Sequence, residues 1–244
     1  MIKIFYIVLG VLLLNVSVTA KEAVKTVKTK EAYHAVWQKL YGGDDDDIAY
    51  DIVALEDGDS AIVGTCKSYN AQRTDICVTR MTAKGDMKWR LWIGGKKKDE
   101  GKAISRAADG SILVLGSSKS FSENYDYDLL AAKVSLDGKL VWQQNLGGKR
   151  DEFAGGIAGT NDGGALIVGD SESYGDGDKD IYIAKLDKNG KVVTEHTIGG
   201  KKADSAKSLT RTRDGNFVMV GYREIERAGN ADFFVMKLDE NGKK

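Results

Sequence analysis

Short apolar runs separated by polar turns recur along the chain at a nearly constant spacing. Each unit holds one run that ends in glycine and a second run that starts with aspartate and ends five residues later with a basic residue. The first runs end at Gly64, Gly116, Gly169 and Gly221, and the second begin at Asp75, Asp128, Asp180 and Asp232. The period is about 52 residues, and self-similarity of this kind predicts a repeat architecture.

Glycine turns separate the runs within each unit. An Asp-Gly pair precedes the first run, at 57–58, 109–110, 162–163 and 214–215. Asp-Gly between β-rich runs favours a type I′ hairpin turn, in which both central residues have positive φ. A second glycine turn leads into a last strand marked by Trp37, Trp89 and Trp142, with Thr194 in the fourth unit, and paired glycines follow. Each unit therefore predicts a four-stranded antiparallel meander without helices.

A single meander with two apolar faces cannot bury itself, so consecutive units are expected to stack as the blades of a β-propeller. We expect an all-β propeller over residues 34–244, with repeats at about 37–88, 89–141, 142–193 and 194–244. The fourth unit lacks a last strand, which residues 34–41 are expected to supply, closing a four-bladed ring with no free edge. The alternative is an open half-ring that pairs with a second chain to make eight blades. The protein is accordingly expected to be a monomer, or a dimer if four blades do not close.

The motif Trp-x4-Gly-Gly, Asp-Gly, Val-Gly and Asp-Ile-Tyr-Ile-Ala-Lys-Leu-Asp resembles the β-propeller repeats of exported bacterial proteins. The resemblance covers residues 34–244 and implies the fold and export, but no activity, because propellers carry many functions. The Gly-Lys-x-x-Trp segment at 138–142 is also similar to the tryptophan-docking repeats of quinoprotein propellers, which have about twice as many blades.

The N-terminal segment has the order of a secretory signal peptide. Residues 1–20 have a lysine at position 3, continue with an apolar run over 4–14 and end in small residues. Residues 21–33 form a lysine-rich linker. The alternative is an uncleaved anchor, for which the apolar run is short. We expect a periplasmic or secreted protein whose mature chain has no membrane span. Lys plus Arg and Asp plus Glu number 36 each, so no general attraction to nucleic acid is expected.

The two cysteines lie on neighbouring strands of the first unit. Cys66 lies just after the second strand and Cys77 just inside the third, so they flank one loop and can be joined across it. An exported chain favours a disulfide between them over two free thiols.

The longer loops between the second and third strands are the expected binding face, because recognition residues concentrate on loops held by a rigid scaffold. These loops are 67–74, 119–127, 171–179 and 223–231. Their candidate ligand-binding residues are Tyr69, Arg73, Asn124, Tyr125, Tyr127, Tyr174 and Arg227. Aromatic, arginine and amide side chains suit a protein, peptide or glycan partner of the cell envelope. The alternative for Tyr69, Phe121 and Tyr174, which lie at matching places in three units, is packing on the loop stems.

The sequence offers few candidate catalytic or metal-binding residues. Asp176 and Asp178 alternate as in a calcium loop, although the later bidentate glutamate of an EF-hand is missing, so Ca²⁺ is the one cofactor considered. No nucleophile motif surrounds either histidine, and no catalytic residue is assigned. The sequence therefore favours an exported, non-enzymatic binding or scaffold module. The alternatives are a small hydrolase or lyase that uses carboxylates on glycans, and a purely structural envelope module.

Overall fold

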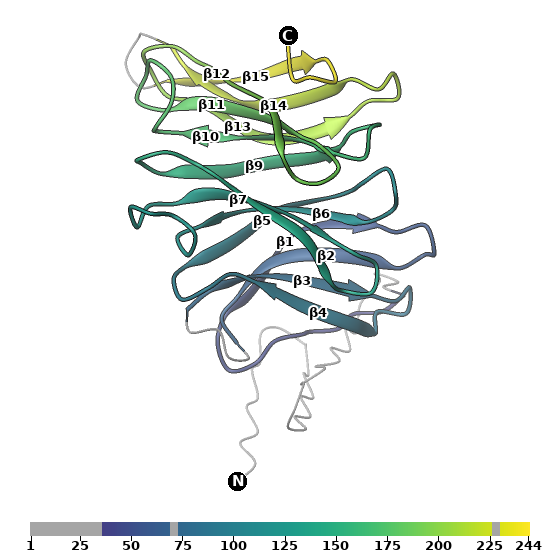
Figure 1. The fold of residues 1–244 in the computed structure, drawn as a ribbon. Coiled ribbons are helices and arrows are strands. Elements are labelled where there is room, and N and C mark those ends of the chain that lie inside the picture. Colours follow the sequence, from purple (N-terminus) through teal and green to yellow (C-terminus); the bar gives the residue numbers. More distant parts are fainter. Residues whose placement is uncertain (1–35, 69–72, 226–229) are drawn as a thin grey trace, which may run out of the picture.

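The computed structural model describes residues 36–68, 73–225 and 230–244, and every regular element in this part is a strand (Figure 1). Blade 1 contains β1 (Asp47–Ala54), β2 (Ser60–Cys66), β3 (Asp75–Met81) and β4 (Met87–Ile93). Blade 2 contains β5 (Asp99–Arg106), β6 (Ile112–Ser118), β7 (Asp128–Val134) and β8 (Leu140–Leu146). Blade 3 contains β9 (Glu152–Gly159), β10 (Ala165–Ser171), β11 (Asp180–Leu186) and β12 (Val192–Ile198). Blade 4 contains β13 (Asp204–Arg211), β14 (Phe217–Glu224) and β15 (Ala231–Leu238).

Each sheet is an antiparallel meander whose strands are hydrogen-bonded in chain order. The four sheets follow one another through the molecule, from blade 1 at one end to blade 4 at the other (Figure 1). The all-β class and the repeated meander predicted from the sequence are confirmed. The expected signal peptide and linker, residues 1–20 and 21–33, lie outside the described residues.

The core consists of three apolar layers, each shared by two consecutive blades. Ile76 and Val78 of blade 1 pack with Val114 and Leu130 of blade 2, and equivalent clusters join blade 2 to blade 3 and blade 3 to blade 4. Burying one such side chain contributes about 1.5–3 kcal/mol. The apolar faces of each blade are therefore covered by its neighbours, as the repeat requires.

The Asp-Gly turns differ from the predicted type I′ turn. Gly58, Gly110, Gly163 and Gly215 have φ between 82° and 85°, but none of the aspartates before them has a positive φ. The Gly110 N–H donates to the carbonyl of Ala107, which makes a type I turn followed by a left-handed glycine. Aspartate suits this turn because its carboxylate accepts the amide two residues on, as Asp109 does from Ser111 at 3.0 Å.

The same turn aspartates bind the basic residue that ends the third strand. Lys133 Nζ lies 2.8 Å from an oxygen of Asp109, and Lys185 Nζ lies 3.1 Å from an oxygen of Asp162. Arg80 and Lys237 make the equivalent ion pairs in blades 1 and 4. This contact explains why an acidic turn residue and a basic strand end recur together in every unit.

The predicted closure of the ring is wrong for the described residues. Instead of pairing with β15, the N-terminal segment lies on blade 1: Trp37 Nε1 donates to the carbonyl of Ala83 at 3.0 Å, and the Tyr41 hydroxyl donates to Gly85. Blades 1 and 4 lie at opposite ends of the stack (Figure 1), so one segment cannot dock on the first and also complete the last. Blade 4 accordingly has three strands within the described residues.

Cys66 and Cys77 form a disulfide across β2 and β3, with a Cα–Cα distance of 5.8 Å. Within the described ranges, no helix has the length and apolar character needed to cross a membrane.

Candidate functional site

The innermost strand of every blade carries a β-bulge at the same repeat position. The strand pairing skips one residue in each of β1, β5, β9 and β13. The skipped residues are Tyr50, Lys102, Gly155 and Lys207. A bulge bends the strand and re-aims a side chain, and bulges are common beside binding sites.

Three of the bulged residues meet around one groove along the inner strands. A cavity of about 460 Å³ is lined by Tyr50, Lys102 and Lys207, together with Phe153, Asp170 and Lys179. Gly155, the fourth bulged residue, lines an adjoining hollow of about 230 Å³ and has no side chain to fill it. We call this region, defined by the six lining residues just named, the axial groove.

The acidic side of the axial groove is held rigidly. Asp170 is only 2% exposed, and its carboxylate accepts hydrogen bonds from the Ser205 hydroxyl at 2.7 Å and the Ala206 amide at 2.9 Å. Lys207 Nζ lies 3.0 Å from the same carboxylate, yet half of the lysine side chain is exposed. The buried aspartate therefore anchors Lys207 without removing it from solvent.

The other groove cations lie beside aromatic rings. Lys102 Nζ is 5.7 Å from the centroid of the Tyr50 ring, and Lys179 Nζ is 4.7 Å from that of Phe153. Ammonium groups above aromatic faces are favourably placed and remain accessible to an acidic ligand. The axial groove thus presents lysines and flat apolar rings together.

Tyr127 connects the predicted loop face with the axial groove. Its ring lies 5.7 Å from Phe153, and its hydroxyl donates to Glu100 Oε1 at 3.2 Å. Burial and the nearby Glu100 charge raise the pKa of Tyr127, so it stays a hydrogen-bond donor at neutral pH. Lys119 Nζ lies 4.4 Å above its ring.

The other predicted ligand-binding residues are spread over the loop face. Tyr125 is 73% exposed with Lys97 Nζ 3.6 Å above its ring, and Asn124 Nδ2 donates to the Gly148 carbonyl at 3.4 Å. The Tyr174 hydroxyl donates to the Gly147 carbonyl at 2.8 Å, so this tyrosine packs on a blade connection. Arg73 is exposed. Tyr69 and Arg227 lie outside the described residues.

Asp176 and Asp178, the candidate calcium ligands, are exposed on the 171–179 loop. In the described part of the chain, no three His, Cys, Asp or Glu side chains converge on a point that could hold a metal ion.

A carboxyl pair organises the connection between blades 2 and 3. Glu152 accepts hydrogen bonds from the Gly148 amide at 2.8 Å, the Ser171 hydroxyl at 2.8 Å and the Ser173 amide at 3.2 Å. Burial and then the negative charge of Glu152 raise the pKa of the neighbouring Asp128 to about 6, although a hydrogen bond from Asn145 opposes the rise. Interaction with the Glu152 carboxyl group therefore favours the protonated form of Asp128.

The comparisons with known proteins agree with this architecture. No family model matches the chain. The regulatory protein FlaEY of Caulobacter vibrioides is 24% identical over an alignment that covers 88% of this chain and 25% of FlaEY, so the chain spans about a quarter of that relative. A protein of unknown function from Bacteroides caccae superposes with a TM-score of 0.52 at 12% identity, covering 92% of this chain and 76% of that one. The fold is that of a β-propeller.

A further solved structure is the β-propeller domain of the Trilobed protease from Pyrococcus furiosus, described as having an open velcro topology. It has a TM-score of 0.46 and 15% identity, covering 81% of this chain and 55% of that one.

The axial groove is the part of the site that the loop prediction missed. Its signal was present: the third residue after the repeated acidic residue is Tyr50, Lys102, Gly155 or Lys207. This position varies, whereas the position before it is always small and the second position after it is always aliphatic. Such variation is typical of a residue that does not hold blades together.

Proposed function

We propose that this chain is an exported, non-enzymatic binding module whose axial groove and adjoining loops hold a protein, peptide or glycan of the cell envelope. The observation that carries the proposal is the four-fold bulge, because it aims Tyr50, Lys102 and Lys207 at one cavity while the surrounding scaffold repeats. A recognition surface needs side chains that differ from repeat to repeat, held by a backbone scaffold that does not change.

The chemistry of the axial groove favours an acidic ligand. Three lysines, Lys102, Lys179 and Lys207, line the cavity with two carboxylates, Asp170 and Glu100. Both carboxylates already have partners, Asp170 in Ser205, Ala206 and Lys207, and Glu100 in Lys98 and Tyr127. Tyr50 and Phe153 add flat faces on which a sugar ring or a peptide side chain can stack. An acidic peptide or a uronate-containing glycan meets both features.

Export is supported by the order of residues 1–20 and by the Cys66–Cys77 disulfide, since such bonds persist in oxidising compartments. The proposed location is the periplasm or the medium outside the cell.

The proposal is tested by applying the purified chain to arrays of acidic and neutral glycans and peptides. Binding should prefer acidic members and weaken about tenfold or more in Lys102→Ala and in Tyr50→Ala, because each removes one groove contact worth about 1.4 kcal/mol or more. Lys139→Ala, on an exposed turn away from the groove, is the matched control and should bind like the parent. Absence of binding, or binding that neither groove substitution changes, would refute the proposal.

A further inference from the structure

The outer face of blade 4 exposes apolar side chains at positions that are buried in every other blade. Phe233 is 86% exposed and Val235 is 62% exposed. The residues at the same repeat positions are at most 1% exposed. They are Ile76 and Val78 in blade 1, Leu129 and Ala131 in blade 2, and Ile181 and Ile183 in blade 3. In those blades the side chains pack on the following blade, so blade 4 presents an uncovered copy of the same surface.

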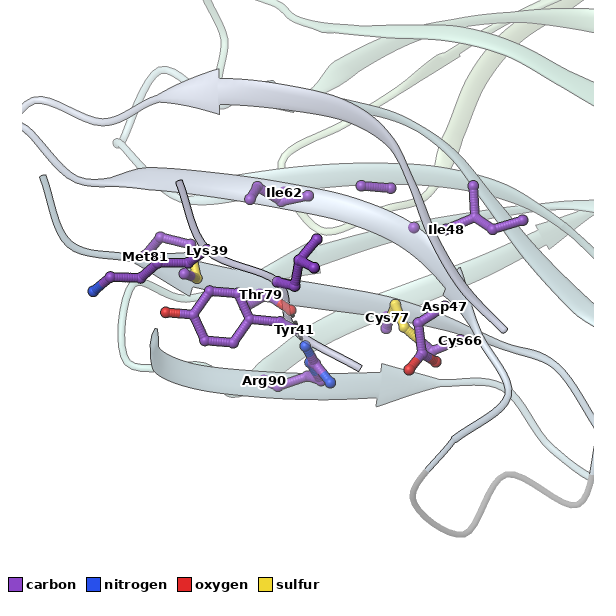
Figure 2. A pocket seen from close by; sticks show the side chains of 13 residues that line it. Lys39, Tyr41, Asp47, Ile48, Ile62, Cys66, Cys77, Thr79, Met81 and Arg90 are labelled. Carbon is purple, nitrogen blue, oxygen red and sulfur yellow. Dashed lines mark hydrogen bonds between the residues drawn. A yellow bond between two sulfur atoms is a disulfide. The ribbon is translucent and has the colours of Figure 1, made fainter. Parts of the chain in front are cut away.

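Blade 1 exposes the complementary surface at the other end of the stack. Ile52 is 61% exposed, whereas its equivalents Ile104 and Ile157 are buried against the preceding blade. Ile52 is paired with Ile62, so both side chains lie on this face. Figure 2 shows a hollow here, of about 220 Å³, lined by Ile62, the Cys66–Cys77 disulfide and other residues beneath the N-terminal segment.

The interior interfaces show how the two end faces fit. Blades 1 and 2 each place a residue of their third strand against a glycine of the next blade. A Cβ built at Gly116 would lie 2.5 Å from Ile76 Cδ1, and one built at Gly169 would lie 3.2 Å from Leu129. Applying the same relation once more places Phe233 over Gly64. The chain therefore carries both halves of one further blade interface.

The N-terminal segment already occupies its place in that interface. Trp89 and Trp142, on the fourth strands of blades 1 and 2, each donate an indole hydrogen bond to the third turn of the next blade, to Leu136 and Lys188. Trp37 makes the same contact with Ala83 of blade 1. Residues 37–41 thus lie where the fourth strand of a preceding blade lies, next to the position that a docked β15 would take.

We propose that two copies of this chain associate head to tail, blade 4 of each on blade 1 of the other, and close an eight-bladed ring. Within one chain these two faces lie at opposite ends of the stack (Figure 1), so a second copy is the occupant that brings them together. Eight blades is within the common range for propellers, and a twofold axis makes both new interfaces identical. The ring also encloses the axial groove, whose far wall the second copy supplies.

The experiment measures the mass of the purified chain by light scattering after gel filtration, at several concentrations. The parent should have twice the mass of one chain. Phe233→Asp and Ile52→Asp should each give monomers, because each buries a charge at both interfaces of the ring; both positions are exposed in the single chain, so the blades should still fold. Tyr125→Asp, at another exposed aromatic residue, is the control and should remain dimeric.

Mixing the two monomeric variants gives a second, independent test. The Phe233→Asp chain keeps an intact blade 1 and the Ile52→Asp chain keeps an intact blade 4, so an equimolar mixture has one unaltered interface and should form a heterodimer. A monomeric parent would overturn the proposal, and so would a ladder of larger species, which indicates an open filament. A dimer that both substitutions leave unchanged would also overturn it.

Discussion

The carboxyl pair Asp128–Glu152 makes the stability of this propeller depend on pH in a direction opposite to that of ordinary acidic residues. Asp128 is 5% exposed, and its pKa rises from 3.8 to about 6 on folding. The folded chain therefore binds this proton more tightly than the unfolded chain does. Its contribution to stability should be full below about pH 4, fall as the pH rises to about 6 and stay constant above.

The magnitude follows from the two pKa values. A tenfold change in proton affinity corresponds to about 1.4 kcal/mol, so the ionised Asp128 costs about 3 kcal/mol of folding free energy at neutral pH. Asp128→Asn keeps the shape and removes the charge. The amide group of the variant can donate to the neighbouring Glu152 carboxylate. Its oxygen can accept from Asn145 Nδ2, which lies 2.6 Å from Asp128 Oδ2. We expect this variant to be about 1–3 kcal/mol more stable than the parent at neutral pH and equal to it near pH 4.

Glu152→Gln is the matched control, because it removes the same charge from the same pair. All three donors around Glu152 need an acceptor, so an amide nitrogen at this place leaves a buried N–H or O–H without a partner. Such a loss costs about 1–3 kcal/mol, and this variant should be destabilised.

The assay is urea unfolding followed by tryptophan fluorescence at about pH 4, 5, 6 and 7.5, the range over which Asp128 titrates. The reasoning would be refuted if Asp128→Asn were as unstable as Glu152→Gln at neutral pH. It would also be refuted if Asp128→Asn kept the parent's dependence on pH.

Two further changes test the turns and the covalent bond. Gly138→Ala should destabilise the chain by about 1–3 kcal/mol more than Gly110→Ala; both glycines have a φ above 80°, but an added Cβ at Gly138 would lie 2.8 Å from the Trp89 ring and one at Gly110 would meet nothing within 4 Å. Equal melting temperatures for the two variants would contradict this role of the tryptophan. Replacing Cys66 and Cys77 with serine should cost about 2–4 kcal/mol in urea unfolding, and two thiols titrating in the unreduced, denatured parent would show that no bond forms.

The strands were predictable from the sequence because the residues that make each structural contact recur in all four repeats. The aspartate of the Asp-Gly turn and the basic end of the third strand recur together, and they bind each other, as Lys133 and Asp109 do. Chance spacing does not produce the same pair in four units. The exact turn type was not predictable in this way, since Asp-Gly suits both a type I′ turn and a type I turn followed by a left-handed glycine.

Closure and the axial groove were not predictable from the strand pattern. Whether a ring closes depends on the angle between neighbouring blades. Side-chain packing in three separate apolar layers sets this angle, and no periodic pattern in the sequence encodes it. A β-bulge adds one residue to one strand and becomes visible only when the partners are paired, as Gly101 and Ala103 are with Gly116 and Leu115 on either side of Lys102.

Repetition separates scaffold from function in this chain, and the two proposals rest on the same reasoning. A repeat position that stays basic in all four blades, such as the one held by Lys133, has an acidic turn partner in each. The residue at the bulge position differs in type between the blades, which favours a role in recognition. The position held by Phe233 is apolar in all four blades, but it is buried in three of them and exposed in blade 4. An apolar side chain that is exposed only in the last blade indicates a missing protein neighbour rather than a ligand. Because that neighbour would also wall the axial groove, assembly and binding are expected to depend on each other.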